Sequence, residues 1–259
     1  MNFPWILTRA PRRHLEGRVF STYEAALVAW VGSEGESATG GEDFRRKRTA
    51  QFYLNRELED EAVTGFSEHW NANEKRDLAR FIGECGNVKA DHVVEVGAGT
   101  GRLSDLLVTL ANKRYTIQEP NAALRCLAFS NLRQSNSAVE IVATSDPVTS
   151  MVDAHGMKAG AVGCVCVGVG MYLTDPEIRK LIGSCDWVLL REDVSPATID
   201  GNRPANVLFC NDGSLHRCKD HFNALIEASG GVVANSRETH PEMLPPGASP
   251  IWTWLIKRR

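Results

Sequence analysis

The sequence predicts an α/β fold built on a Rossmann-like sheet, because an apolar strand runs into a glycine-rich turn and a helix, and further apolar strands recur along the chain. The first strand is expected at 92–96, and the glycines of the turn stand at every second position, at Gly97, Gly99 and Gly101. Glycine permits the positive φ of a tight turn and lets a ligand approach the main chain. The helix start that follows offers free N–H groups to a polar or anionic ligand. The stretch is therefore a candidate cofactor loop.

The spacing of the glycines separates two kinds of cofactor loop. A dinucleotide site has the pattern G-x-G-x-x-G, whereas this chain has G-x-G-x-G, with Glu95 two residues before the first glycine. The next expected strand ends in Glu119, where doubly wound folds put a carboxylate on the ribose hydroxyls of a nucleotide. This arrangement resembles motif I of class I S-adenosylmethionine (SAM) methyltransferases, which implies SAM as the cofactor, held by Glu95, the three glycines and Glu119. The alternative is an α/β turn that binds no ligand.

Length and composition indicate one α/β domain with an extension. The chain has 259 residues, 43% hydrophobic and 24% charged, and its net charge of −3 gives no general argument for binding nucleic acid. No apolar run reaches the roughly 20 residues of a membrane-spanning helix. The seven cysteines include no C-x-x-C pair, so reduced thiols are expected rather than disulfides or a metal site.

The remaining strands are expected at the spacing of alternating βα units. They lie at 115–119, 139–143, 161–169, 187–191 and 251–256. The segment 161–169 is apolar throughout, as a central strand covered on both faces should be. Helices are expected at 175–184 and after residue 220. This order fits the seven-stranded sheet of the class I methyltransferases, in which the last strand is antiparallel.

The chain is expected to divide near residue 75. Residues 1–75 would form an N-terminal extension, a helical cap, and residues 76–259 the methyltransferase domain. The first twenty residues contain four arginines and a single acid, Glu16. Such a segment fits either a mitochondrial presequence at 1–20, removed before Ser21, or a basic arm on a cytoplasmic or nuclear protein.

The densest basic run of the sequence lies within the extension. It consists of Arg45, Arg46, Lys47 and Arg48. A basic cluster can contact phosphates, which keeps a nucleic-acid partner open. The favoured interpretation is a solvated helix face, neutralised by the acids between residues 57 and 61.

The second half of the chain resembles the protein α-N-terminal methyltransferases, which methylate the free amine of a processed protein N-terminus. The resemblance covers about residues 90–259, and five short runs carry it: 97–102 (GAGTGR), 172–175 (YLTD), 191–193 (RED), 211–217 (NDGSLHR) and 229–231 (SGG). It implies a protein or peptide N-terminus as the methyl acceptor.

The same resemblance implies roles for individual residues. On the cofactor side, Arg102 would bind the carboxylate of SAM, and Ser145 and Asp146 would lie along its adenine. On the acceptor side, Asp212 matches an acid that the family places near the substrate amine. Asp193 stands where the family has an asparagine that binds the incoming N-terminus.

The third expected acceptor residue is Tyr172, which stands where the family has a histidine proposed as a general base. An amine attacks the methyl group only when neutral, so acceptors near it must orient it and take a proton. The alternatives are purely structural roles, in which Asp212 begins a turn, Asp193 ends a strand at the surface and Tyr172 belongs to the core.

Several departures from the family affect the acceptor pocket more than the cofactor loop. A glutamine-tryptophan pair of the family is replaced by Val167 and Gly168, and its N-terminal aromatic segment is reduced to Trp30 and residues 38–41. Three hypotheses therefore stand. The first is methyl transfer to a protein amine, and the second is an inactive methyltransferase-like subunit that scaffolds a protein or ribonucleoprotein complex. The third is nucleic-acid methylation, although residues 168–171 do not form the expected N-P-P-Y-like tetrapeptide.

Overall fold

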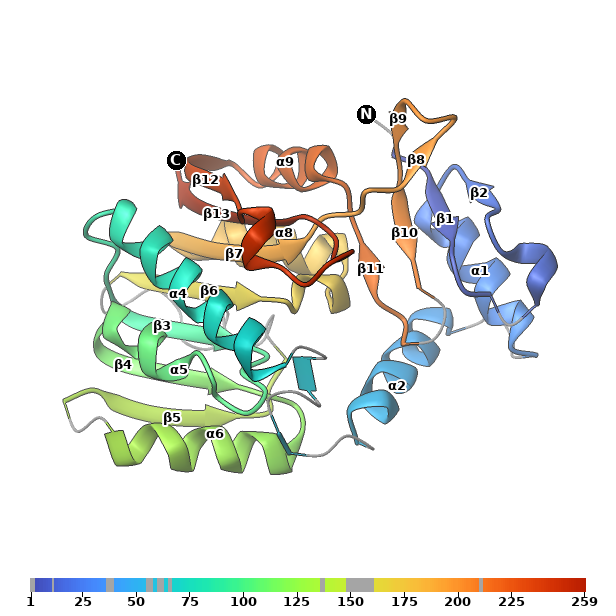
Figure 1. Cartoon of the computed structure of the whole chain (residues 1–259). Coiled ribbons are helices and arrows are strands. Elements are labelled where there is room, and N and C mark those ends of the chain that lie inside the picture. Colours follow the sequence, from blue (N-terminus) through green and yellow to red (C-terminus); the bar gives the residue numbers. More distant parts are fainter. Residues whose placement is uncertain are drawn as a thin grey trace.

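A computed structural model of the chain shows a large sheet and a small sheet joined through a helix (Figure 1). The structure describes residues 3–10, 12–35, 40–54, 58–59, 63–64, 67–135, 138–147, 161–209 and 212–259. Among these residues, no helix is long and apolar enough to cross a membrane.

The large sheet has seven strands in the order β12-β13-β7-β6-β3-β4-β5. The strands are β3 (Ala90–Val96), β4 (Ala111–Gln118), β5 (Glu140–Thr144), β6 (Val162–Val167), β7 (Trp187–Asp193), β12 (Gly231–Glu238) and β13 (Ile251–Arg258). The first five are parallel, and β13 is antiparallel to both β7 and β12. The expected fold class is confirmed, including the antiparallel last strand. The apolar strand β6 lies between β3 and β7, where both of its faces are covered.

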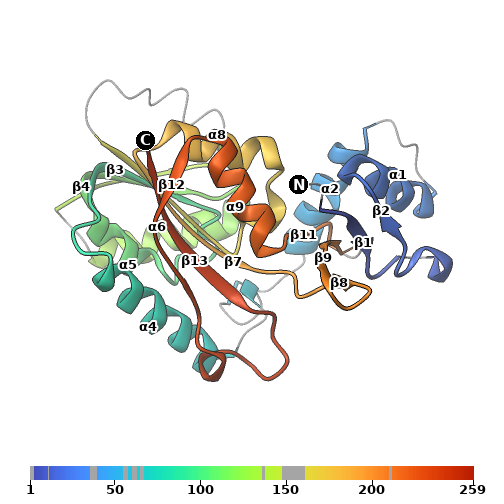
Figure 2. The same ribbon diagram turned by 90° about the horizontal axis from the view of Figure 1, so that it is seen from above.

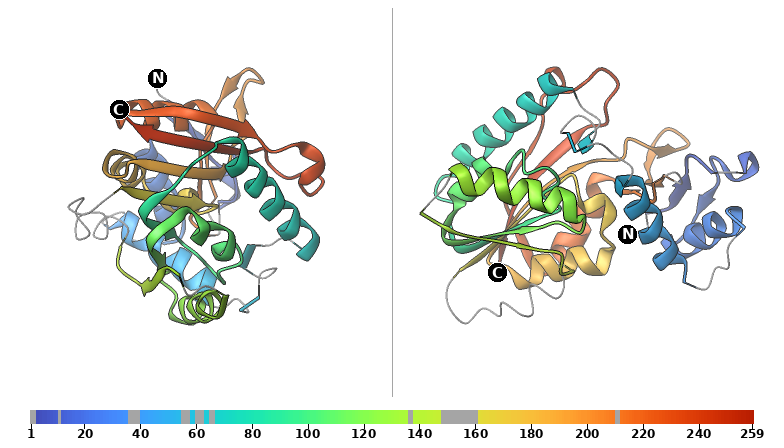
Figure 3. Two further views of the ribbon diagram at one scale, coloured as in Figure 1. Left: turned by 90° about the vertical axis from the view of Figure 1, so that its left-hand side faces the viewer. Right: turned by 90° about the horizontal axis from the view of Figure 1, so that it is seen from below.

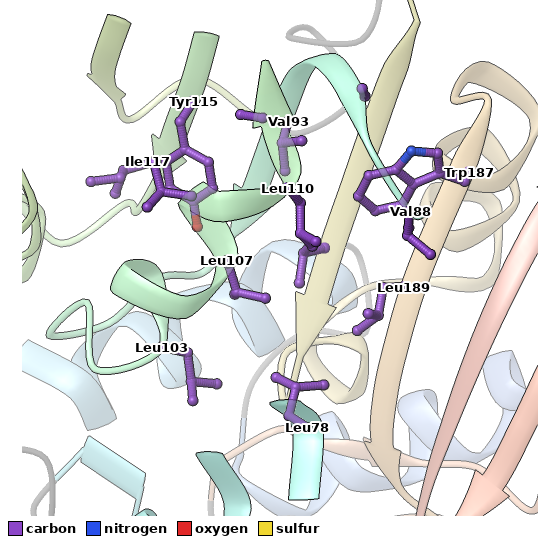
Figure 4. Packing of buried hydrophobic residues seen from close by; sticks show 14 of the residues in the cluster. Leu78, Val88, Val93, Leu103, Leu107, Leu110, Tyr115, Ile117, Trp187 and Leu189 are labelled. Carbon is purple, nitrogen blue, oxygen red and sulfur yellow. The ribbon is translucent and has the colours of Figure 1, made fainter. Parts of the chain in front are cut away.

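One face of the sheet is covered by α4 (Glu68–Glu84), α5 (Ser104–Leu107) and α6 (Ala122–Ser135). Figure 4 shows the apolar side chains between these helices and the strands, among them Leu78, Leu107 and Ile117. The boundary expected near residue 75 falls inside α4, and Leu78 and Phe81 of this helix are buried against the sheet. The helix expected after the glycines, α5, has four residues and continues as a 3-10 turn, η2 (Val108–Leu110).

The opposite face is covered by α8 (Asp175–Ser184) and α9 (Lys219–Ala228), with the 3-10 turn η3 (Gly170–Tyr172) before α8. Their apolar faces, including Ile178, Leu181 and Phe222, pack on Val188 and Trp254 of the sheet. A hydrogen bond from the Thr174 N–H to the Glu177 carboxylate at 2.8 Å fixes the start of α8.

The N-terminal extension is not only helical, because its first residues form strands of the small sheet. The order is β11-β10-β1-β2, with β1 (Trp5–Leu7), β2 (Val19–Phe20), β10 (Asn206–Leu208) and β11 (Leu215–His216). Helix α1 (Tyr23–Ser33) packs on this sheet through Leu27 and Trp30. Removal of residues 1–20 would delete β1 and β2 and leave β10 without its parallel partner. The segment also contains η1 (Arg13–Leu15), and elsewhere the chain forms the hairpin β8 (Thr198–Ile199) and β9 (Arg203–Pro204) and the turn η4 (Pro241–Met243).

Helix α2 (Gly41–Leu54) lies between the large sheet and the small sheet when the chain is seen from above (Figure 2) or from below (Figure 3, right). It carries the basic run, and the expectation of a solvated face was wrong for Arg45, which is fully buried. The Arg45 guanidinium pairs with Glu42 and donates to the carbonyl oxygens of Gly213 (2.7 Å) and Tyr172 (3.0 Å). Burial of the side chain is possible because these groups satisfy its donors.

The neighbouring arginines of α2 are also paired. Arg46 binds Glu177 at 2.9 Å and Arg48 binds Glu34 at 2.6 Å, while the Lys47 side chain is exposed. The partners are therefore Glu34, which follows α1, and acids on α2 and α8. Of the acids expected at 57–61, all but Glu59 lie outside the described residues. This pairing weakens the argument that the run binds the phosphates of a nucleic acid.

Candidate functional site

A cavity of about 800 Å³ lies where the parallel strands of the large sheet end, and α2 contributes one of its walls. We name its two halves after the predicted roles of their residues. The cofactor half contains Glu95, residues 97–100, Arg102, 118–121, Ser145 and Pro147. The acceptor half contains Thr49, Tyr53, 167–169, Tyr172, 191–193, His216 and Ile251. In open α/β sheets, ligands bind outside the carboxyl ends of the strands, where neighbouring connections leave in opposite directions. β3 and β6, with their helices on opposite faces, provide such a point.

The glycine loop has the geometry that the sequence predicted. Gly97 has φ +64°, and a Cβ there would stand 2.5 Å from a Val169 methyl group. Gly101 has φ +82°, and a Cβ there would stand 2.8 Å from the Ala128 main chain in α6. A side chain at either position is therefore excluded by backbone conformation and by packing.

Glu119, the acid expected to bind a ribose, is hydrogen-bonded to the same glycine loop. It accepts hydrogen bonds from the Gly99 N–H and the Asn121 N–H, both at 2.9 Å, and it lines the cavity. Burial raises its pKa, and the two N–H donors oppose that shift. Each carboxylate oxygen keeps a second lone pair, so the side chain can also accept from the hydroxyls of a bound ribose.

Glu95 lines the cavity but also braces the loop. Its Oε2 accepts from the Ser104 and Tyr115 hydroxyls, and burial raises its pKa to about 7. The carboxylate thus joins β3, α5 and β4 beneath the glycines.

Arg102 has one guanidinium nitrogen that could donate a hydrogen bond to the carboxylate of a ligand. One end of its guanidinium pairs with Glu74 of α4, and the side chain lines the cavity. Its Nη1 is buried and has no hydrogen-bond partner within the described part of the chain. A buried N–H without a partner is costly, so the site favours an anionic oxygen at this position.

The two residues expected along the adenine are placed differently. Ser145 lines the cavity together with Pro147. Asp146 is not among the described lining residues, and its main chain bonds to Thr144 Oγ1 (3.0 Å) and Gln118 Nε2 (3.2 Å). The structure thus gives Asp146 a part in fixing the loop after β5.

Asp193 lies at the end of β7 in the acceptor half. Its pKa is raised to about 6, because burial and the neighbouring Glu74 carboxylate disfavour its charge more than Arg191 favours it. The preceding residue, Glu192, accepts from the N–H groups of Gly170 (2.6 Å) and Val169 (3.1 Å), and burial raises its pKa to about 8. At neutral pH Asp193 is therefore largely ionised and Glu192 largely protonated.

Tyr172 also faces the cavity, but its environment opposes the base role that the resemblance implied. Its hydroxyl lies 2.6 Å from the Tyr53 hydroxyl of α2. Burial, together with nearby Tyr53 and Asp212, raises its pKa far above the usual range. A phenol that stays neutral can orient a ligand by hydrogen bonding but does not serve as a phenolate base.

Asp212 is not among the described residues that line the cavity. Its Oδ1 accepts from the Ser214 N–H (3.0 Å) and the Ser214 hydroxyl (2.8 Å), so the carboxylate closes its own turn. Its carbonyl oxygen accepts from the Thr49 hydroxyl of α2 at 2.7 Å. The structure thus brings Asp193 and Tyr172 to the cavity and uses Asp212 to hold the turn beside it.

His216 is a cavity residue that the sequence reasoning did not assign. It lies on β11, packs against Phe209 with ring centres 4.4 Å apart, and has its pKa lowered to about 4 by burial. The imidazole is therefore neutral at pH 7 and carries a nitrogen that can accept a hydrogen bond. The signal for this residue in the sequence is the run 211–217, which contains His216 as well as Asp212.

Gly168 stands where the resemblance placed a tryptophan. A Cβ at this residue would meet no heavy atom of the described residues within 4 Å, and the residue lines the acceptor half, so this side of the cavity has open space. Within the described ranges, no group of His, Cys, Asp and Glu side chains is arranged to hold a metal ion.

No family model matches the chain, and no curated protein matches it. The fold is similar to that of a SAM-dependent methyltransferase of the DUF858 family from Leishmania major, with a TM-score of 0.73 and 16% identity over 99% of this chain and 97% of that one. It is also similar to a 1,6-didemethyltoxoflavin-N1-methyltransferase from Burkholderia thailandensis with bound substrate and S-adenosylhomocysteine (TM-score 0.56, 12% identity, 83% and 88% covered).

A third similar structure is the magnesium protoporphyrin IX methyltransferase of Synechocystis PCC 6803 with bound S-adenosylhomocysteine (SAH), with a TM-score of 0.51 and 12% identity over 91% of this chain and 99% of that one. At these identities the similarity establishes the fold, which is the Rossmann-like class I methyltransferase fold.

Proposed function

We propose that this chain, which has the class I methyltransferase fold, binds SAM in the cofactor half of the cavity and transfers a methyl group to an amine in the acceptor half. The observation that carries the proposal is that one cavity joins the glycine loop, Glu119 and Arg102 to Asp193 and His216. SAM bound here would supply a methyl group activated by its sulfonium.

On the cofactor side, the chain offers complementary groups to the carboxylate and to the ribose of SAM. Arg102 would bind the carboxylate through its unsatisfied Nη1, and Glu119 would accept hydrogen bonds from the ribose. The glycines of the loop have positive φ, which favours glycine, and because glycine has no side chain the ligand can contact the main chain. The structures of similar fold with bound SAH support this assignment.

On the acceptor side, Asp193 and His216 favour an amine. The ionised Asp193 attracts the ammonium form and can accept hydrogen bonds from its N–H groups. The ammonium would pass its proton to the Asp193 carboxylate, and the neutral His216 can accept a hydrogen bond from the resulting amine. Helix α2 and Tyr172 wall this half, so the acceptor has to enter a restricted space.

We further propose a protein or peptide N-terminus as the acceptor. Its support is the resemblance of residues 90–259 to the α-N-terminal methyltransferases together with the position of Asp193. The open space beside Gly168 indicates that the preferred N-terminal residues differ from those of that family.

The test is methyl transfer from labelled SAM by the full chain to peptides with a free α-amino group. The matched control is the same peptides after N-acetylation. Transfer to the free peptides alone is the expected result. If SAH binds but neither these peptides nor a cell extract is labelled, the inactive scaffold becomes the better account.

A further inference from the structure

A single carboxylate, Glu74 of α4, holds two guanidinium groups at the border between the two halves of the cavity. Its Oε2 pairs with Arg102 Nη2, and its Oε1 lies 3.2 Å from Arg191 Nε on β7. Glu74 is 9% exposed and Arg191 is 1% exposed, and all three residues line the cavity. Burial opposes the charge of Glu74, but the two guanidiniums more than offset it and keep its pKa below the usual value.

Arg191 is held in place by further contacts. Its Nη1 donates to Asp77 Oδ2 at 3.0 Å and to Thr253 Oγ1 at 2.7 Å. Glu74 and Asp77 are three residues apart on α4, so both face β7 from one side of the helix. These contacts fix the plane of the Arg191 guanidinium.

Each guanidinium keeps one buried nitrogen without a partner. These nitrogens are Arg102 Nη1 and Arg191 Nη2, and neither has a hydrogen-bond acceptor among the residues that the structure describes. Most buried donors in proteins are satisfied. The two guanidiniums are held by one carboxylate and belong to residues that line one cavity, so their unsatisfied nitrogens offer donors and positive charge that suit a carboxylate ligand.

We infer that Arg191 and Arg102 together form a site for a carboxylate, and that Glu74 is the positioning residue that orients both. This inference rests on the proposed function, because the carboxylate assigned to the site is that of the amino-acid moiety of SAM. A carboxylate of the methyl acceptor has the same chemistry and is the second possible source.

The test compares two ligands of the full chain that differ in the carboxylate. SAH carries it, whereas 5′-methylthioadenosine lacks the whole amino-acid part. The variants are Glu74→Gln, which keeps the side-chain size and removes the charge, and Arg191→Lys. Lys75→Gln is the matched control, because Lys75 is the next residue of α4 and pairs with the exposed Asp105.

Both variants should weaken SAH binding about tenfold or more, which corresponds to losing a charge-assisted hydrogen bond. Their affinity for methylthioadenosine, and both affinities of Lys75→Gln, should stay unchanged. Equal weakening of both ligands would show a merely structural role, and unchanged SAH binding would also overturn the assignment. Should SAH binding stay unchanged while the KM of an acidic acceptor peptide rises, the carboxylate would belong to the acceptor.

One arm of the test needs no variant. The wild-type chain should bind S-adenosyl-3-thiopropylamine, the decarboxylated analogue of SAH, at least tenfold more weakly than SAH. Equal affinities would overturn the inference even if a variant failed to fold. Binding of neither SAH nor methylthioadenosine by the wild type would instead refute the proposed function.

Discussion

The hydroxyl groups of Tyr53 and Tyr172 lie 2.6 Å apart and join α2 to the turn that precedes α8. The two rings meet nearly at right angles, with centres 5.6 Å apart. Both residues line the acceptor half of the cavity, so the N-terminal extension contributes directly to the proposed acceptor site.

Tyr172→Phe should lower kcat/KM for the acceptor about tenfold and leave SAH affinity unchanged, because it removes a hydrogen bond and no charge. Protonation of Asp193, whose pKa is about 6, should lower the activity at acidic pH. Burial raises the Tyr172 pKa and keeps the phenol neutral, so this acidic limb of the pH profile should persist in the variant. Steady-state kinetics between pH 5 and 9 provide the measurement. Complete loss of activity with intact SAH binding would instead restore an essential role for the hydroxyl.

Asp193→Asn should remove that acidic limb and stabilise the fold at neutral pH. The folded pKa of Asp193 is about 6, above its ordinary value of 3.8. The folded state therefore retains the proton between these values, and wild-type stability falls as pH rises from about 4 to about 6. Asparagine does not titrate and avoids this loss.

Denaturant unfolding should show the variant more stable by about 1 to 3 kcal/mol at pH 7.5 and nearly equal to wild type at pH 4. Asp105→Asn, at an exposed carboxylate on α5, is the control and should show no such gain. A variant less stable than wild type at pH 7.5 would indicate that Asp193 is a structural partner of Arg191.

Arg45→Met should destabilise the chain by about 2 kcal/mol or more, because it leaves the carbonyl oxygens of Gly213 and Tyr172 buried without their donor. Lys47→Met on the same helix is the control, and its effect should stay within about 0.5 kcal/mol. Urea unfolding measures both. Equal effects of the two substitutions would contradict the structural role of Arg45.

Gly99→Asp should abolish SAH binding. A Cβ at Gly99 would lie 3.3 Å from Val63 at a φ of +57°, and the new carboxylate would stand beside Glu119, which binds the Gly99 N–H. Gly83→Asp, at an exposed helix position where a Cβ meets no atom of the described chain within 4 Å, should bind SAH normally. Calorimetry distinguishes the two, and normal binding by Gly99→Asp would place the ligand elsewhere.

The sequence predicted those parts of the protein that local patterns determine. The apolar strands and the glycine turn follow from residue spacing, since backbone conformation and burial act within a few neighbours. The attachment of Glu119 to Gly99 follows from the βαβ unit that brings the two strand ends together.

The parts that sequence reasoning missed depend on contacts between distant segments. The basic run predicted a solvated Arg45, because its carbonyl partner on Gly213 is 168 positions away and no local pattern indicates that contact. His216 and Arg191 gave no sign of facing the cavity, because their burial is set by β11 and α4. Asp212 was placed at the amine, but its own serine neighbour satisfies it.

Equilibrium titration of the full wild-type chain with SAH tests the central claim most directly. The account predicts one SAH per chain, with an affinity that is lost in Gly99→Asp and weakened in Arg102→Met, because these residues form the cofactor half of the cavity. No binding heat and no shift of the unfolding midpoint at millimolar SAH would contradict the account.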